Sequence, residues 1–418
     1  MDKMKDFIKK HLKDDVNKLA LSKFPEDIDK QFVIRQIQAR QVLSKKLQSW
    51  ADNDELIFPK KLSLEQCSSE LTAKYKSSLV KGKTLIDLTG GMGVDTAFLS
   101  DNFEKTFYVE MQEELCEIAK HNFTILNKNI EVVNDNAEHF LTICDEVDCI
   151  YLDPARRDEY GRKMVSLHDC SPDVVDLHDL LLKKAKTILI KVSPMLDIEM
   201  VKKELEDIVE IHVVAVRNEC KELVLVLSQQ TTVNRQQSLP MARSSWLTAI
   251  DLRENWNFAF SEDEELNAQW TLADAVGKYL YEPGAACMKA GCFKLLSQRY
   301  SLDKLHRNSH LYTSDELVAD FPGRIFEVIS VVPFDKKTKK EISLRCQQST
   351  VNGQQALEES SKLKAQSSKL KVSVATRNFP LSADELRKNL GLQDGSDFYI
   401  FGTTMKGEKK VVILTQKK

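Results

Sequence analysis

Short apolar runs alternate with longer amphipathic segments through the middle of the chain. The runs are TLIDL (84–88), TFYVE (106–110), IEVV (130–133), CIYLD (149–153) and TILIKV (187–192). Between them, segments such as MQEELCEIAKHNFTIL and PDVVDLHDLLLKKA have apolar residues at helical spacing. Strands that alternate with helices of about 10–15 residues are typical of a parallel sheet covered by helices. The pattern therefore predicts an α/β fold with a doubly wound, Rossmann-like sheet.

Two more apolar runs close this block. IHVVAV (211–216) and ELVLVL (222–227) are separated by only five residues. A connection this short cannot hold a crossover helix, so we expect the last two strands to be antiparallel.

The segments on either side of the block differ from it. The first 80 residues have apolar positions at helical spacing, and the polar stretch SQQTTVNRQQSLP (228–240) is the expected linker. From Gly323 onward, strand-like runs surround one helix with a capping box, formed by Ser382 and Glu385, and a stop at Gly391.

We therefore expect an N-terminal helical region and smaller C-terminal α+β domains beside the Rossmann-like sheet. The expected parts are 1–80 (helical region), 81–229 (α/β domain), 230–322 (linker and a small domain) and 323–418 (C-terminal domain).

The composition excludes several classes of protein. With 418 residues and 42% apolar residues, the chain can bury sizeable cores and is not wholly disordered. No stretch approaches the roughly 20 apolar residues of a membrane span, and the charged start MDKMKDFIKKHLKDD is unlike a secretory signal. Nine scattered cysteines without a CxxC pair indicate reduced thiols, so we expect a cytoplasmic protein.

The charge is unevenly distributed along the chain. The formal net charge is −3, but Val331 to Lys418 holds 17 Lys and Arg against 9 Asp and Glu, a net charge of +8. The remainder carries −11. A basic C-terminal block on an acidic body indicates a nucleic-acid partner, although a lysine-rich solvated surface gives the same count.

A glycine-rich loop follows the first strand of the block. LIDLTGGMGVDT places Gly90, Gly91 and Gly93 between that strand and a helix, where glycine lets a ligand approach the backbone. A dinucleotide fingerprint needs a third glycine where this chain has Thr96. A structural turn rich in glycine is the alternative.

Two acids accompany this loop. Asp87 precedes it, where a carboxylate would repel a pyrophosphate but could pair with an amino-acid ammonium group. Glu110 ends the second strand, the usual place for an acceptor of ribose hydroxyls. A ligand with a ribose, an ammonium group and no phosphate is S-adenosyl-L-methionine.

The fourth strand ends in DPARR. Asp153 is then at a strand carboxyl end, where it can accept a hydrogen bond or proton from a nucleophile. Arg156 and Arg157 suit a phosphate or carboxylate substrate. Asp-Pro is also a common turn opener, which is the alternative. Lys191, at the end of the next strand, either holds substrate phosphate or extends from the sheet edge.

These motifs, in this order, resemble those of class I S-adenosylmethionine-dependent methyltransferases. The resemblance implies the following roles: Asp87, Thr89, Gly90, Gly91 and Gly93 hold the methionine end, Glu110 the ribose, Met111 and Asp135 or Asn136 the adenine, and Asp153 faces the methyl acceptor.

The chain departs from that pattern at two positions. Thr89 replaces the usual first glycine of the loop. Ala155 and Arg156 follow Asp153-Pro154 where amine methyltransferases have a proline and an aromatic residue, so the platform for stacking a flipped base is missing.

Longer segments resemble one bacterial family of methyltransferases. They are SLEQCSSELTAKYK (63–76), YLYEPGAACMKAG (279–291), KLHRNSHLYTSDE (304–316), DFPGRIFEV (320–328) and TRNFPLSADELRKNLG (376–391). The resemblance implies a ferredoxin-like domain within 230–322 and a THUMP-like domain at 323–418. Because THUMP domains bind RNA, it also implies a methyltransferase acting on tRNA or rRNA. A protein or small-molecule substrate, or a cofactor-binding RNA adaptor without catalysis, is the alternative.

One further pattern is close to a metal site. Cys287, Cys292, His306 and His310 approach the spacing of a two-cysteine, two-histidine zinc finger. The central gap of 13 residues and the glycines in this segment do not fit that motif, so we expect no metal.

Overall fold

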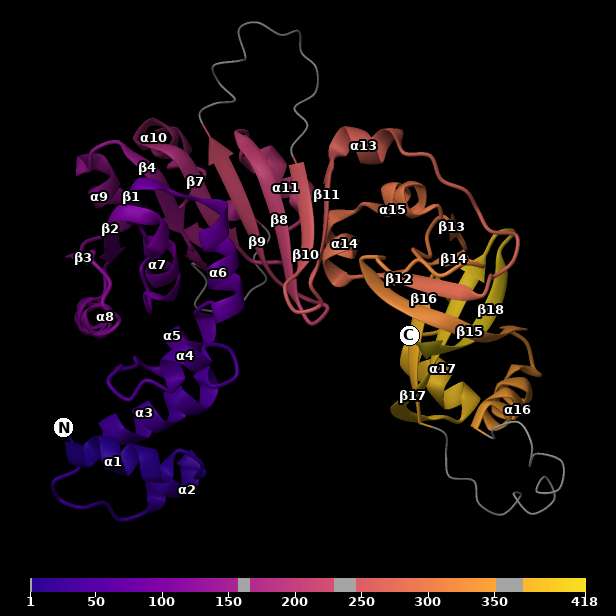
Figure 1. Cartoon of the computed structure of the whole chain (residues 1–418), viewed down its shortest axis with the longest axis horizontal. Coiled ribbons are helices and arrows are strands. Elements are labelled where there is room, and N and C mark those ends of the chain that lie inside the picture. Colours follow the sequence, from indigo (N-terminus) through magenta and orange to yellow (C-terminus); the bar gives the residue numbers. More distant parts are fainter. Residues whose placement is uncertain (1, 157–165, 229–245, 351–370) are drawn as a thin grey trace, which may run out of the picture. The chain divides into compact units, whose positions relative to one another are not determined.

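The computed structural model describes residues 2–156, 166–228, 246–350 and 371–418. The chain divides into two compact units, one of Met1–Val214 and Lys221–Ser245 and the other of Ala215–Cys220 and Trp246–Lys418. Their elements are labelled in Figure 1. The linker expected at 228–240 lies, except for Ser228, outside the described residues.

The first unit contains the predicted α/β sheet. Its strands are β1 (Gly82–Asp87), β2 (Phe103–Glu110), β3 (Ile130–Asn134), β4 (Val147–Leu152), β7 (Ala185–Val192), β8 (Ile208–Val216) and β9 (Glu219–Ser228). They lie in the order β8-β9-β7-β4-β1-β2-β3. Pairing is parallel from β7 through β3, whereas β9 runs antiparallel to β7. The prediction of a mainly parallel sheet is confirmed, and β8 and β9, the two strands expected to pair, are neighbours in it.

Helices precede the sheet and connect its strands. The first group is α1 (Asp2–His11), α2 (Val16–Leu21), α3 (Lys30–Leu43), α4 (Gln48–Ala51), α5 (Lys61–Gln66) and α6 (Glu70–Leu79). The connecting helices are α7 (Val94–Leu99), α8 (Glu113–Ile125), α9 (Ala137–Ile143), α10 (His178–Lys184) and α11 (Ile198–Glu204). Within the described ranges, no helix combines the length and the apolar character that crossing a bilayer requires.

One apolar core joins the N-terminal helices to the sheet. Leu43 of α3, Trp50 of α4 and Phe58 pack in the same buried cluster as Met92 and Phe123. The chain segment before the first strand is therefore packed against the domain that carries the glycine loop.

The second unit contains a mixed sheet of its own. In chain order the unit begins with β10 (Trp246–Asp251) and β11 (Trp256–Ser261), an antiparallel pair outside that sheet. They are followed by α13 (Glu262–Asn267), β12 (Tyr279–Pro283), α14 (Ala285–Ala290), α15 (Phe293–Tyr300), β13 (Asp303–Lys304) and β14 (Tyr312–Ser314). It continues with β15 (Gly323–Pro333), α16 (Thr338–Thr350), β16 (Lys371–Arg377), α17 (Ala383–Leu390), β17 (Gln393–Met405) and β18 (Lys409–Lys417). The strand order is β13-β14-β12-β15-β18-β17-β16, which includes one parallel pair, β16 with β17.

Alternation along β18 gives this sheet two apolar faces. Val412 and Leu414 pack in one cluster with Leu386 of α17, and Val411 and Ile413 pack in another with residues such as Leu280. Successive side chains of a strand point to opposite faces, so both faces are covered.

The helix predicted after Ser382 is confirmed at both ends. Ser382 and Glu385 form the capping box of α17, and Gly391 ends it in the left-handed conformation, with a φ of 71°. These are local signals, which explains why the sequence alone located them.

Buried charges connect α6 to β9 and to α7. The Lys76 side chain is 0% exposed, and its Nζ lies 2.7 Å from Glu222 Oε1 of β9 and 3.2 Å from Asp95 Oδ1 of α7. Its Nζ also donates to Ser68 Oγ at 3.0 Å. A buried ammonium is tolerated because carboxylates and a hydroxyl replace its water shell.

We expect Lys76→Met to destabilise the first unit by about 3–5 kcal/mol, because two buried carboxylates lose their counter-charge. Lys74→Met is the matched control on the same helix. Its side chain is 59% exposed and pairs with Glu70, so a cost below about 1 kcal/mol is expected. Chemical denaturation of both variants gives the two free energies, and equal values would contradict this role of Lys76.

Candidate functional site

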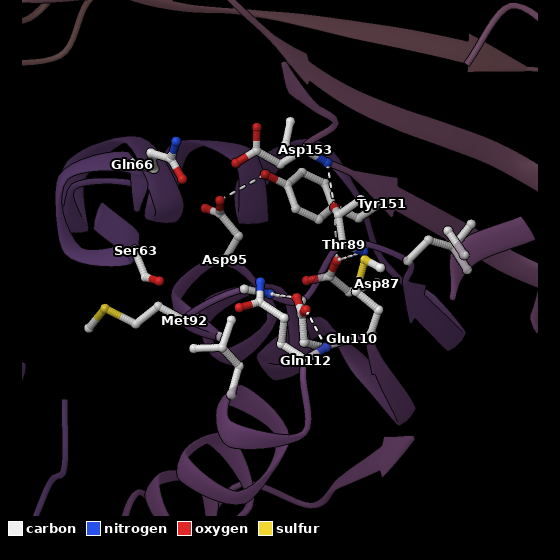
Figure 2. Close-up of a pocket in the computed structure, with 18 of the residues that line it drawn as sticks. Ser63, Gln66, Asp87, Thr89, Met92, Asp95, Glu110, Gln112, Tyr151 and Asp153 are labelled. Atoms are coloured by element: carbon white, nitrogen blue, oxygen red, sulfur yellow. Dashed lines mark hydrogen bonds between the residues drawn. The ribbon is translucent and has the colours of Figure 1, made fainter. Parts of the chain in front are cut away.

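A pocket lies where β1, β2 and β4 end, with a cavity volume of about 290 Å³. Figure 2 shows Asp153, Thr89, Asp87 and Glu110 following one another along one side of it. The lining residues are Ser63, Gln66, Cys67, Ser68, Asp87, Leu88, Thr89, Gly90, Gly91, Met92, Gly93, Val94, Asp95, Glu110, Met111, Gln112, Leu115, Asp135, Asn136, Ala137, Glu138, Tyr151, Asp153, Ala155, Ser171 and Pro172. Strand carboxyl ends of an open parallel sheet are the usual place for a ligand.

The glycine loop requires glycine at specific positions. A Cβ on Gly90 would lie 2.3 Å from the Tyr108 ring, and Gly93 has a φ of 80°, which other residues rarely adopt. The Tyr108 hydroxyl also donates to the Gly91 carbonyl at 2.6 Å. The loop is held close over the sheet with little side-chain bulk, a shape that lets a ligand contact its backbone.

Asp87 is buried beneath this loop. Its Oδ1 accepts a hydrogen bond from the Thr89 amide at 2.9 Å, and its Oδ2 accepts from the Thr96 hydroxyl at 2.5 Å. Burial raises the pKa of Asp87 to about 7. The group predicted to pair with the cofactor ammonium is therefore a carboxyl that changes its charge near neutral pH.

Glu110 connects the loop to the end of β2. Its Oε2 accepts from the Gly91 amide and its Oε1 from the Gln112 amide, both at 2.9 Å. The residue is 9% exposed and lines the pocket. The ribose-binding role of Glu110 stays a prediction, and the carboxylate already orients the loop that would surround the cofactor.

The three residues expected near adenine line the same pocket. Met111 is 73% exposed. The Asp135 carboxylate contacts His139 Nδ1 at 2.7 Å, and the Asn136 side chain caps α9 by accepting from the His139 amide. An apolar side chain beside fixed polar groups suits a flat heterocycle, and this placement also stays a prediction.

Asp153 follows β4 and lines the pocket. Its amide donates to Thr89 Oγ1 at 2.6 Å, and its Oδ2 forms an ion pair with Lys191 Nζ. Burial raises the pKa of Asp153, although Lys191 opposes that shift. Arg157 lies outside the described residues, and of Arg156 only the backbone is described, in the short strand β5 (Ala155–Arg156), which pairs with β6 (Cys170–Ser171).

Three pocket residues gave no recognisable signal in the sequence. Asp95 Oδ2 accepts hydrogen bonds from the Ser68 and Tyr151 hydroxyls, each at 2.7 Å, and all three line the pocket. The Tyr151–Asp95 bond is drawn in Figure 2. Although burial alone would raise the pKa of Asp95, the charges of Lys76 and Lys191 lower it. These residues lie on separate elements, so only the fold brings them together.

A helix before the first strand also reaches the pocket. Gln66 and Ser63 of α5 line it, as Figure 2 shows. Ser69 and Thr72, which follow in the sequence, form the capping box of α6.

The cysteines and histidines with zinc-like spacing have other contacts. The Cys292 thiol donates to the Cys287 carbonyl, and His306 contacts Glu408 and Asn378. His310 stacks on Phe293 with ring centroids 3.7 Å apart. Among the described residues, a group whose side chains are close enough to hold a metal ion lies elsewhere, at His168, Asp173 and Asp176.

Comparison with known proteins adds two domain matches. Residues 279–322 match a ferredoxin-like domain family, and residues 356–417 match a THUMP domain-like family. Both matches confirm the domain types that the sequence resemblance implied.

Comparison over longer stretches identifies methyltransferases. A crystal structure assigned as a methyltransferase from Porphyromonas gingivalis W83 is 32% identical and covers 99% of this chain and 97% of that chain, with a TM-score of 0.81. Uncharacterized S-adenosylmethionine-dependent methyltransferases from two Mycobacterium tuberculosis strains, CDC 1551 / Oshkosh and H37Rv, are 23% identical over 282 residues. That stretch is 67% of this chain and 72% of each relative.

If Asp87 pairs with the cofactor ammonium, as predicted, we expect S-adenosylmethionine to bind about fivefold more tightly at pH 7 than at pH 6. A carboxyl with a pKa of about 7 is about one tenth ionised at pH 6 and about half ionised at pH 7, whereas an α-ammonium group stays mostly protonated at both values. Isothermal titration calorimetry at the two pH values measures the ratio. In Asp87→Asn the difference should disappear, whereas an equal pH dependence in that variant would assign the titration to another group.

Proposed function

Because the chain belongs to the S-adenosylmethionine-dependent methyltransferases that carry a ferredoxin-like and a THUMP-like domain, we propose that it methylates structured RNA, tRNA or rRNA. The observation that carries the RNA substrate is the position of the THUMP-like match. It covers residues 356–417, within the C-terminal block whose net charge is +8. Positive charge favours the RNA backbone irrespective of its sequence.

The described residues support a division of the pocket into two ends. S-adenosylmethionine, when bound, supplies an electrophilic methyl group. Asp87, Glu110 and the glycine loop between them are assigned to hold and orient it, because all of them line the cavity and Glu110 bonds the loop. Asp153 is assigned to the acceptor, and orientation of the two reactants is the main contribution of the protein to the rate.

Thr89 links the two ends. Its amide donates to Asp87, and its hydroxyl accepts from the Asp153 amide. The residue that replaces the usual loop glycine therefore fixes the distance between the cofactor acid and the acceptor acid.

We expect Asp153→Asn to reduce methyl transfer to RNA at least about 100-fold, because the amide cannot take up a proton from the acceptor. Transfer is measured with tritium-labelled S-adenosylmethionine and bulk tRNA and rRNA. Asp145→Asn, an exposed acid just before β4, is the control and should keep wild-type activity. Label that enters protein or metabolites but not RNA would overturn the RNA assignment. Equal rates in wild type and Asp153→Asn would remove Asp153 from the chemistry.

The basic block generates a separate prediction for binding. Lys409 and Lys410 are exposed at the start of β18, and reversing both charges in the full chain should weaken binding of bulk tRNA about tenfold at low salt. The slope of log affinity against log salt should fall by about 2. Reversal of Lys10 and Lys13, exposed near the N-terminus, is the control. Equal losses from both double variants, in electrophoretic or anisotropy titrations, would indicate general electrostatics rather than a C-terminal RNA site.

A further inference from the structure

Two lysines form ion pairs with carboxylates that line the pocket. Lys191 Nζ of β7 forms an ion pair with Asp153 Oδ2, and the two side chains are 13% and 33% exposed. Lys76 Nζ, deeper in the unit, pairs with Asp95 and Glu222. Three carboxylates therefore hold two ammonium groups within the first unit, and the acceptor acid is one of the three.

The two members of the Lys191–Asp153 ion pair differ in whether they can take up a proton. Burial alone would lower the pKa of Lys191, but the carboxylates of Asp153, Asp95 and Glu222 raise it above its usual value. Lys191 therefore stays an ammonium group and cannot act as a base at neutral pH. Burial raises the pKa of Asp153, which makes its carboxylate the better proton acceptor of the two.

Once Asp153 has taken up the proton of the acceptor, the Lys191 ammonium group no longer faces a charged partner there, and its positive charge discriminates between acceptors. When an amine nitrogen attacks a methyl group, positive charge develops on the nitrogen, and a neighbouring ammonium group repels it. When a hydroxyl attacks, its oxygen loses a proton and carries negative charge, which a preorganised cation stabilises.

The pocket wall next to Asp153 supports the same choice. Among the described residues that line it, Ala155, Ser171 and Pro172 are not aromatic, and Tyr151 is 1% exposed with its hydroxyl bonded to Asp95, so none of these four offers an exposed ring face on which a base taken out of its stack could rest. A ribose hydroxyl lies on the RNA backbone and can be reached without flipping a base.

We propose that the methyl acceptor is the ribose 2′-hydroxyl of RNA, with Asp153 as the catalytic proton acceptor and Lys191 as the positioning residue that holds it. The inference rests on the proposed function and names its substrate group. Within an RNA strand the 3′ and 5′ oxygens are esterified, so the 2′ oxygen is the free hydroxyl.

The reaction is balanced with the groups present. A bond forms between the 2′ oxygen and the methyl carbon, and the carbon–sulfur bond breaks with its electron pair left on sulfur. The hydroxyl proton passes to Asp153 Oδ1, because Lys191 occupies Oδ2, and then to water. The products are a methyl ether and a neutral thioether.

Alkaline hydrolysis of labelled RNA tests the acceptor. The wild-type full chain is incubated with tritium-labelled S-adenosylmethionine and unmodified transcripts of tRNA and rRNA, and the RNA is then hydrolysed in alkali. Alkali cleaves a phosphodiester through the free 2′-hydroxyl, so a 2′-methyl ether protects the neighbouring bond. We expect the label in dinucleotides. Label in mononucleotides would overturn the hydroxyl assignment while RNA methylation stands, and label in no RNA, together with transfer to a protein or metabolite fraction, would overturn both.

Variants of Lys191 test its charge separately. We expect Lys191→Met to lower kcat about 100-fold and to change the KM for S-adenosylmethionine less than about twofold. Lys191→Arg, which keeps the charge, should recover at least about one tenth of the wild-type rate. Lys186→Met is the matched control on β7, because its side chain is 78% exposed and pairs with Asp148 at 2.6 Å.

Two results would overturn the role of Lys191. One is a wild-type kcat in Lys191→Met, and the other is a folded Lys191→Arg as slow as Lys191→Met. If Lys191→Met does not fold, as its melting curve would show, Lys191→Arg alone decides: a rate of at least about one tenth of wild type supports the proposal, and a lower rate with an intact fold contradicts it.

Discussion

The compensation of buried charge is the constraint on which the first unit depends. Lys76, Asp95, Glu222, Lys191 and Asp153 come from α6, α7, β9, β7 and the end of β4. A charge in the interior is costly unless its partner is close, so each of these elements has little freedom to move away from the others. The same interactions that fix the elements also fix the Asp153 carboxylate, which is proposed to face the methyl acceptor, so the stability of the fold and the geometry of the site have one physical origin.

Much of the first unit could be predicted because its signals are local. An apolar run of five or six residues reports a buried strand, whatever its neighbours are, and β1 and β4 lie where those runs predicted them. The loop with Gly90 and Gly93 could be located because its backbone conformation needs glycine. Ser382 and Gly391 mark the ends of α17 for the same reason, since caps satisfy backbone groups within one turn.

The rest of the site depends on contacts between distant positions. Lys76 and Glu222 are 146 positions apart, and nothing in the segments around them distinguishes a buried lysine from a solvated one. The sequence identifies Lys191 only as a lysine at the end of a strand, because its partner Asp153 follows β4, and neither segment shows that β4 lies beside β7. The Tyr151 hydroxyl finds Asp95 on another element for the same reason.

Thr89 has a consequence for how this loop can be exchanged with loops of other proteins. Its hydroxyl accepts a hydrogen bond from the Asp153 amide, so the structure of the loop depends on the segment after β4 and the loop cannot be exchanged by itself. A graft with glycine at residue 89 would preserve the backbone path around the cofactor and still leave an amide at the opposite end without its acceptor. When this pocket is engineered, residue 89 and the segment after β4 therefore have to be exchanged together.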